Sequence, residues 1–168
     1  MRDARFFSDI SEKADAMRFR EITDKDVPEL FVVRSSTDEN NLSVLDLYNM
    51  GVTEEICVDK LHGTYKGWLC EIEKRIVGFS IGDCSTGEMW VIAVMPSYIG
   101  QGIGSKLLYL VEDWLYKKGC NELWLSTDID TKLRAYSFYK KHGWVDSEIK
   151  DGLRFMTKTK PRKLYSPK

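Results

Sequence analysis

The segment that most restricts how this 168-residue chain can fold is VMPSYIGQGIGSKLLYLVEDWLYKKG, from Val94 to Gly119. Its three glycines alternate at Gly100, Gly102 and Gly104, and an amphipathic run at helical spacing follows at once. Glycine lets a backbone approach a ligand closely, and the first turn of a helix presents unpaired N–H groups and a favourable dipole to an anion. The segment therefore predicts a turn that holds an anion through its backbone, followed by a helix that ends at Gly119.

The remaining sequence predicts strands and helices in an order typical of a mixed α/β sheet. Periodicity, capping residues and turn signals predict strands at 17–22, within 67–84, at 87–96, at 121–129 and in a hairpin over 144–160, and helices at 23–36, 41–61, 105–118 and 131–143. We expect the second of these helices to be broken or bent near Gly51. Hairpin turns are expected at Glu73-Lys74-Arg75 and at Asp151-Gly152.

Composition bounds the domain organisation and the partners. Since 43% of the residues are hydrophobic, we expect a single domain over 17–160, with an N-terminal arm over 1–16 and a basic tail over 161–168. The 25 Lys and Arg residues nearly balance 26 Asp and Glu residues, which argues against a nucleic-acid or membrane partner. The four cysteines are widely spaced, which predicts reduced thiols and no metal site. No apolar run approaches the roughly 18 to 20 residues of a membrane span, so we expect a cytoplasmic protein.

Two common phosphate-binding patterns do not fit the glycine run. A dinucleotide fingerprint needs G-x-G-x-x-G, but Ser105 stands where the third glycine should be. A P-loop ends in G-K-S/T, whereas Gly104-Ser105-Lys106 has the last two residues in the reverse order. The hypothesis of a nicotinamide-binding protein is therefore supported by the alternating glycines alone.

The pattern that does fit is a strand ending in V-x-P followed by G-x-G-x-G/A, and in it the chain resembles the GCN5-related N-acetyltransferase (GNAT) family. In that family such a segment wraps the pyrophosphate of coenzyme A. The matching residues are Val94, Pro96, Gly100, Gly102, Ile103 and Gly104. RAYSFYKKHGW is similar to the family's A-x-x-F-Y-x-x-x-G-F segment, and the resemblance extends over roughly 17–159. It implies the GNAT acyl-CoA N-acyltransferase fold, a mixed, mostly antiparallel sheet flanked by helices.

The resemblance also implies a site for acetyl-CoA as co-substrate, without a metal. The residues expected to contact it are Ile92, Val94, Ile99, Gly100, Gln101, Gly102, Ile103, Gly104, Ser105 and Tyr139. Two positions depart from the family pattern: Ile99 replaces its usual Arg or Gln, and Lys132 replaces a frequent Asn. We expect Ile99 to leave the backbone donors of the glycine turn intact.

Acetyl transfer to an amine needs a base, because an alkyl ammonium with a pKa of roughly 10.4 must lose a proton before it attacks. The resemblance places the catalytic base six residues before Val94, at Glu88. Alternation along the strand then predicts that Glu88, Trp90 and Ile92 share one face and line a cleft. A solvent-exposed carboxylate at the end of the strand is the open alternative.

The leaving thiolate needs a proton, and the oxyanion needs a donor. The resemblance assigns the first role to the phenol of Tyr139 and the second to a backbone N–H near Val94. Tyr136, one helical turn before Tyr139, is the fallback donor. A purely structural aromatic in the core is the alternative for Tyr139. His142 is interpreted as a helix C-terminal cation or a surface residue rather than a catalytic base.

Together these observations predict an N-acetyltransferase that moves the acetyl group of acetyl-CoA to a primary amine by direct attack in a ternary complex. The nearly neutral charge favours a small-molecule amine, and a protein or peptide acceptor is the alternative. Ile99 and Lys132 keep open a different class, an acyl-CoA-binding module without turnover. Pairing into a homodimer is also left open by the resemblance.

Overall fold

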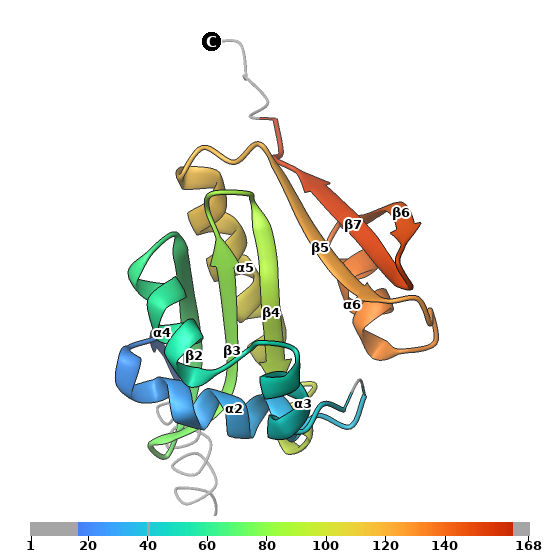
Figure 1. Cartoon of the computed structure of the whole chain (residues 1–168). Coiled ribbons are helices and arrows are strands. Elements are labelled where there is room, and N and C mark those ends of the chain that lie inside the picture. The colour runs from blue at the N-terminus through green and yellow to red at the C-terminus, as the bar shows by residue number, and fades with distance from the viewer. Residues whose placement is uncertain (1–16, 40, 163–168) are drawn as a thin grey trace, which may run out of the picture.

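The computed structural model describes residues 17–39 and 41–162 and builds them around a seven-stranded sheet with helices on both faces (Figure 1). The strands are β1 (Met17–Glu21), β2 (Tyr65–Ile72), β3 (Arg75–Asp83), β4 (Glu88–Val94), β5 (Glu122–Asp128), β6 (Val145–Lys150) and β7 (Leu153–Thr159). Their order is β1-β2-β3-β4-β5-β7-β6, and β4–β5 is the parallel pair among antiparallel neighbours. The predicted mixed, mostly antiparallel sheet is confirmed; the predicted arm over 1–16 and residues 163–168 of the tail lie outside the described residues.

The helices divide between the two faces of this sheet. They are the 3₁₀ turns η1 (Asp24–Asp26) and η2 (Pro96–Tyr98) and the α-helices α2 (Val27–Ser35), α3 (Val44–Asn49), α4 (Glu54–His62), α5 (Ile103–Lys117) and α6 (Arg134–Lys141). Helix α2 packs its apolar side on β3 and β4, and α3 and α4 pack beside it. The opposite face is covered by α5, whose buried leucines share a core with β5, β7 and α6.

Local turn chemistry fixes the predicted hairpins. Glu73 and Lys74 both have positive φ, 51° and 63°, and so do Asp151 and Gly152, at 51° and 75°. Two consecutive residues with positive φ form the turn that matches the twist of paired strands. Gly51, at φ 81°, separates α3 from α4, so of the two predicted alternatives, a break or a bend, the structure has the break.

The middle of the sheet is split where its one parallel pair lies. Strands β4 and β5 share the single pairing of Glu88 with Trp124. From that point they diverge toward their carboxyl ends, and β5 continues into its pairing with β7 (Figure 1). The edge of β4 that faces β5 is therefore without a strand partner beyond Glu88.

Strand β4 contains a β-bulge that overturns one prediction. Val91 pairs with Ile81 and Met89 with Gly82, so Trp90 is an extra residue in β4. Trp90 packs on the α2 and α4 side, whereas Ile92 packs on the α5 side. The prediction that Glu88, Trp90 and Ile92 share one face is wrong, because the inserted residue reverses the alternation.

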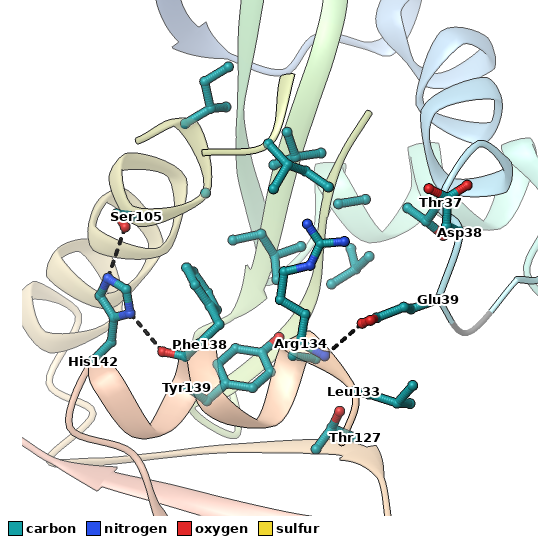
Figure 2. Close-up of a pocket in the computed structure, with 18 of the residues that line it drawn as sticks. Thr37, Asp38, Glu39, Ser105, Thr127, Leu133, Arg134, Phe138, Tyr139 and His142 are labelled. Atoms are coloured by element: carbon teal, nitrogen blue, oxygen red, sulfur yellow. Dashed lines mark hydrogen bonds between the residues drawn. The ribbon is translucent and has the colours of Figure 1, made fainter. Parts of the chain in front are cut away.

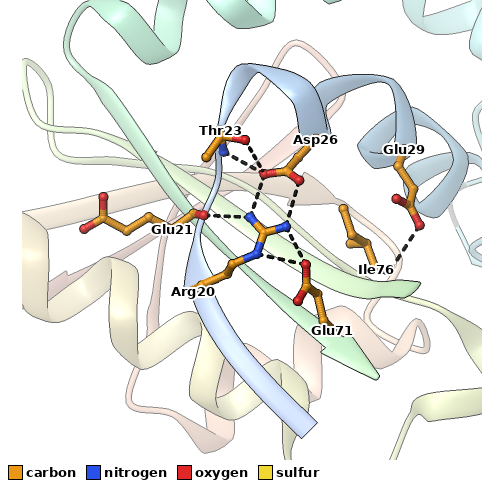
Figure 3. A network of polar contacts seen from close by, with 7 residues as sticks. All are labelled: Arg20, Glu21, Thr23, Asp26, Glu29, Glu71 and Ile76. Atoms are coloured by element: carbon orange, nitrogen blue, oxygen red, sulfur yellow. Dashed lines mark hydrogen bonds and ion pairs between the residues drawn. The ribbon is translucent and has the colours of Figure 1, made fainter. Parts of the chain in front are cut away.

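The side chain of Arg20 joins β1 to the start of the helical layer (Figure 3). Its guanidinium donates to Asp26 through two hydrogen bonds of 2.7 and 2.8 Å and also pairs with Glu71 on β2. The Thr23 backbone N–H and hydroxyl donate to Asp26 Oδ2 at 2.7 and 3.0 Å. The bonds from Arg20, with those from Thr23, lower the pKa of Asp26 to about 2 despite its burial. This network holds the N-terminus of α2 against β1 and β2. The C-terminal end of α2 forms one wall of the site described next.

Candidate active site

A cleft of about 570 Å³ opens along the split between β4 and β5 (Figure 2). Its walls are the end of α2 with the loop that follows, residues 90–94 of β4, the glycine turn, the end of β5 and one side of α6. A cleft of this size is large enough to enclose part of a cofactor-sized molecule. The glycine turn and α2 stand at opposite ends of it, so a ligand held at the turn can extend along β4 toward α2.

The glycine turn has the geometry of an anion cradle. Gly100 and Gly102 have φ of 84° and 81°, and a Cβ added at either would meet no atom within 4 Å. Within the described part of the chain, the N–H groups of residues 100–105 have no backbone hydrogen-bond partner. Gly102 is the N-cap of α5, so these donors converge at the positive end of a 15-residue helix.

The other glycine and its neighbour play different parts. Gly104 has no positive φ, and its added Cβ would lie 3.5 Å from the Phe138 ring, an ordinary contact. Ile99 lines the cleft, but its N–H already bonds to the Pro96 carbonyl at 3.3 Å. Unpaired donors therefore begin at Gly100, and replacing the family's Arg or Gln by Ile99 leaves them intact, as expected.

Most of the predicted cofactor residues gather in this cleft. Those that line it are Ile92, Val94, Ile99, Gly100, Gly102, Ile103, Gly104, Ser105 and Tyr139. Gln101 is exposed and does not belong to the lining. Contact of each with a bound cofactor stays a prediction.

The backbone of β4 offers the predicted oxyanion donor. Met95 N donates to Val77 O on β3, and directions alternate along an antiparallel strand. Val94, which lies opposite Gly78 in the next pair, therefore directs its N–H away from β3 and toward the split. The N–H of Ile92 has the same direction, so two donors face the cleft.

Tyr139 reaches the cleft from α6, beside Phe138 (Figure 2). It is 9% exposed, and burial raises the pKa of its phenol, while the positive charge of Arg34 acts in the opposite direction. The phenol therefore keeps its proton at neutral pH, as an acid must. Tyr136 does not line the cleft: its hydroxyl donates to Asp146 Oδ2 at 2.9 Å on β6.

Glu88 lies at the point where β4 and β5 part, two residues before the cleft lining begins. Its side chain is half-buried. Burial and the nearby negative charge of Asp83 raise the pKa of Glu88, and the charge of Lys60 partly opposes them. A carboxylate with a raised pKa is a better proton acceptor, but Glu88 is not among the residues that line the cleft. Its role as base stays a prediction.

Two side-chain contacts in the cleft were not expected from the sequence. Glu39, in the loop after α2, accepts a 2.7 Å hydrogen bond from the Arg134 backbone N–H at the start of α6 (Figure 2). The N-cap of α6 is Leu133, which has no side-chain acceptor, so Glu39 takes over that function from 95 residues away. The Arg134 side chain points across the cleft toward β4 (Figure 2).

The second contact joins α6 to α5. His142 Nε2 lies 2.9 Å from Ser105 Oγ, and its Nδ1 lies 2.7 Å from the Phe138 carbonyl oxygen. His142 therefore lies in the cleft wall at the C-terminus of α6, not free on the surface. The one sequence signal for it was its position in the same motif as Tyr139.

A sheet split beside a backbone anion cradle is suited to an elongated ligand that carries a phosphate group and lies along a strand edge with free N–H donors. Residues 32–144 match the model of the Acetyltransferase (GNAT) family, and the chain belongs to that family. The resemblance drawn from the glycine and F-Y motifs is thereby confirmed.

Known proteins resemble the chain in sequence and in fold. It is 29% identical over 102 residues to an uncharacterised N-acetyltransferase of Methanocaldococcus jannaschii, covering 54% of the chain and 44% of that protein. It is 41% identical over 61 residues to thialysine N-epsilon-acetyltransferase of Bos taurus, covering 36% and 35%. The matches thus span less than half of these relatives. PaiA N-acetyltransferase of Thermoplasma acidophilum in complex with coenzyme A has a similar fold, with a TM-score of 0.73 at 19% identity, over 86% of this chain and 99% of that one.

Two features are absent from residues 17–39 and 41–162, a membrane-spanning helix and a cluster of metal ligands. None of the helices there combines the length and hydrophobicity of a bilayer-spanning segment. No group of three or more His, Cys, Asp or Glu side chains in that part of the chain is arranged to hold a metal ion.

Proposed function

We propose that this protein transfers the acetyl group of acetyl-CoA to a primary amine of a small molecule, by direct attack in a ternary complex. The observation that carries the proposal is the cradle of unpaired N–H groups at residues 100–105, continuous with a cleft along the free edge of β4. The donor set suits a pyrophosphate, because several N–H groups converge and nothing fills the space over Gly100 and Gly102. Acetyl-CoA supplies the activated acetyl group as a thioester.

Groups of the chain itself can stabilise the oxyanion and carry out the two proton transfers. The N–H groups of Ile92 and Val94 face the split, where they can stabilise an oxyanion. Tyr139 holds its proton and lines the same cleft, so it can protonate the departing thiolate. Glu88, at the point where β4 and β5 part, accepts the proton of the amine through water. Each proton then has a named source and destination.

The acceptor is proposed from the end of the cleft near α2. That end carries carboxylates at Asp38 and Asp128 and guanidinium groups at Arg34 and Arg134, with the indole of Trp90 between β4 and the helices. A wall with charges of both signs suits a small amine that also carries a second charged group, such as a diamino acid. The name of the bovine relative, a thialysine N-epsilon-acetyltransferase, agrees with this class.

The test is release of free CoA from acetyl-CoA, detected by mass so that the four cysteines do not interfere. Acceptors would include diamino acids, polyamines, aminoglycosides and a lysine peptide. We expect release to depend on a small amine, and Tyr139→Phe to lower kcat by about 100-fold while acetyl-CoA still binds. Tyr136→Phe is the matched control, since its hydroxyl bonds to Asp146 outside the cleft. Acetylation of the peptide alone would refute the small-molecule acceptor, and tight binding without release for every amine would favour a non-catalytic acyl-CoA module.

A further inference from the structure

The side chains of Ser105 and His142 meet where the first turn of α5 lies beside the end of α6. Ser105 is the third residue of α5, at the end of the run of unpaired N–H groups, and its hydroxyl oxygen is 2.9 Å from His142 Nε2. His142 Nδ1 is 2.7 Å from the Phe138 carbonyl, and the imidazole and Phe138 ring centroids are 4.5 Å apart. Both ring nitrogens thus have partners, and the ring is held between the two helices that border the anion cradle.

These partners determine where the hydrogens lie. A carbonyl oxygen can only accept, so Nδ1 carries a hydrogen in either protonation state. In the neutral ring Nε2 has a lone pair, and the Ser105 hydroxyl donates to it. The hydroxyl hydrogen is then unavailable, and only oxygen lone pairs remain to face an anion in the cradle.

Protonation reverses the second hydrogen bond. In the imidazolium, Nε2 also carries a hydrogen and donates to Ser105 Oγ. The hydroxyl hydrogen can now turn toward the cradle, which gains both a donor and a nearby positive charge.

We infer that His142 and Ser105 form a proton-linked part of the phosphate site, in which protonation of His142 releases the Ser105 hydroxyl to donate to a pyrophosphate oxygen. The inference rests on the proposed CoA donor and adds to it a residue that positions a binding group. Because such coupling is reciprocal, a bound pyrophosphate favours protonated His142 as strongly as protonation favours binding.

Other charged groups lie on the elements around this pair. They are Lys141 on α6, Lys106 on α5, and Lys158 on β7, whose Nζ pairs with Glu112 Oε2 on α5 at 2.9 Å. Lysines keep their charge at neutral pH, so they attract a pyrophosphate equally over the range in which a histidine changes charge, about pH 5 to 8. A change in affinity across that range therefore reports on the imidazole.

The experiment is calorimetric titration of the full chain with dephospho-CoA at about pH 6 and about pH 8. This probe keeps the pyrophosphate diester, whose charge is constant in the range, and lacks the 3′-phosphate, which titrates there. We expect binding to be about tenfold tighter at the lower pH, the size of one charge-assisted hydrogen bond. His142→Gln should remove this dependence, and Ser105→Ala should reduce it to the part that the imidazolium charge alone supplies. Pantetheine, which has no phosphate, should show none.

His62 supplies the matched control, because the chain has two histidines and His62 pairs with Asp24 at 2.7 Å away from the cleft. His62→Gln should keep the full pH dependence. Thermal unfolding measurements check that each variant is folded. If His142→Gln does not fold, Ser105→Ala alone tests the inference. A pH dependence as large in the Ser105 variant as in the wild type overturns this inference and leaves the proposed function standing. Absence of dephospho-CoA and acetyl-CoA binding by the wild-type chain at both pH values overturns the two together.

Discussion

Substituting Gly102 by Ala separates what the glycine turn contributes to folding from what it contributes to binding. Gly102 has φ 81° and no atom within 4 Å of an added Cβ, so the methyl group meets no clash in the free protein. The cost to folding is that of holding an L-residue in the left-handed region, about 1–2 kcal/mol. For a chain of this length that free energy corresponds to a fall in Tm of roughly 2–8 °C.

The effect on ligand binding should be larger. The methyl group would occupy the open space over the unpaired N–H groups of residues 100–105, where the anion is proposed to lie. We expect Gly102→Ala to weaken acetyl-CoA binding by more than about tenfold, since displaced phosphate oxygens lose hydrogen bonds to several donors. Isothermal titration calorimetry measures this loss, and differential scanning calorimetry measures the change in stability.

Gly104→Ala is the matched control. Gly104 lies inside α5 without positive φ, and its added Cβ would make an ordinary 3.5 Å contact with Phe138. Alanine favours a helix by up to about 1 kcal/mol over glycine, so Tm should stay level or rise slightly. Wild-type affinity in Gly102→Ala would refute the placement of the anion over the turn, and equal losses in both variants would refute the distinction between the two glycines.

Three further predictions concern the Arg20–Asp26 pair, the cap of α6 and the candidate base. The pKa of Asp26, lowered to about 2 from 3.8, means that its pairing with Arg20 stabilises the fold above about pH 4 and that this contribution is lost as the pH falls toward 2. Asp26→Asn should therefore cost about 2 kcal/mol in urea unfolding at pH 7, with the difference from wild type shrinking at pH 3; a constant difference would contradict the linkage. Glu39→Ala should remove the cap of α6, costing about 1 kcal/mol and speeding amide exchange at Arg134, whereas Glu39→Gln keeps an acceptor and should stay near wild type. Glu88→Gln should lower kcat by about 100-fold and abolish the acidic limb of the pH profile, because the raised pKa of Glu88 governs when it can accept a proton; an unchanged profile would assign the base elsewhere.

Features of the fold that depend on neighbouring residues were predictable from the sequence. The hairpin turn at Asp151-Gly152 follows from two residues that tolerate positive φ, and the break at Gly51 follows from one. Helix α5 ends before Gly119, which has φ 97°, as its apolar spacing and C-terminal glycine indicated. In each case the conformation is determined within a few residues of the chain.

Features that depend on a distant partner were not predictable in this way. At the bulge, the neighbouring residues Ile81 and Gly82 of β3 pair with Val91 and Met89 of β4, and Trp90 is left over. The alternation of residues in β4 alone does not reveal this pairing. The cap that Glu39 gives to α6 and the contact of His142 with Ser105 join segments 95 and 37 residues apart. A periodicity argument treats each segment separately and therefore misses such contacts.

The split in the sheet explains why the site lies where these local and distant features meet. A parallel pair joined at one position, Glu88 with Trp124, leaves β4 with one paired edge and one free edge. The paired edge holds the strand rigid against β3, while the free edge keeps the N–H groups of Ile92 and Val94 available. Extending the β4–β5 pairing would satisfy those donors and close the cleft at the same time. The chain thus leaves strand hydrogen bonds unmade at the place where a ligand can make them. The contact of His142 with Ser105 joins α6 to α5, and these helices hold the two halves of the sheet together around that gap.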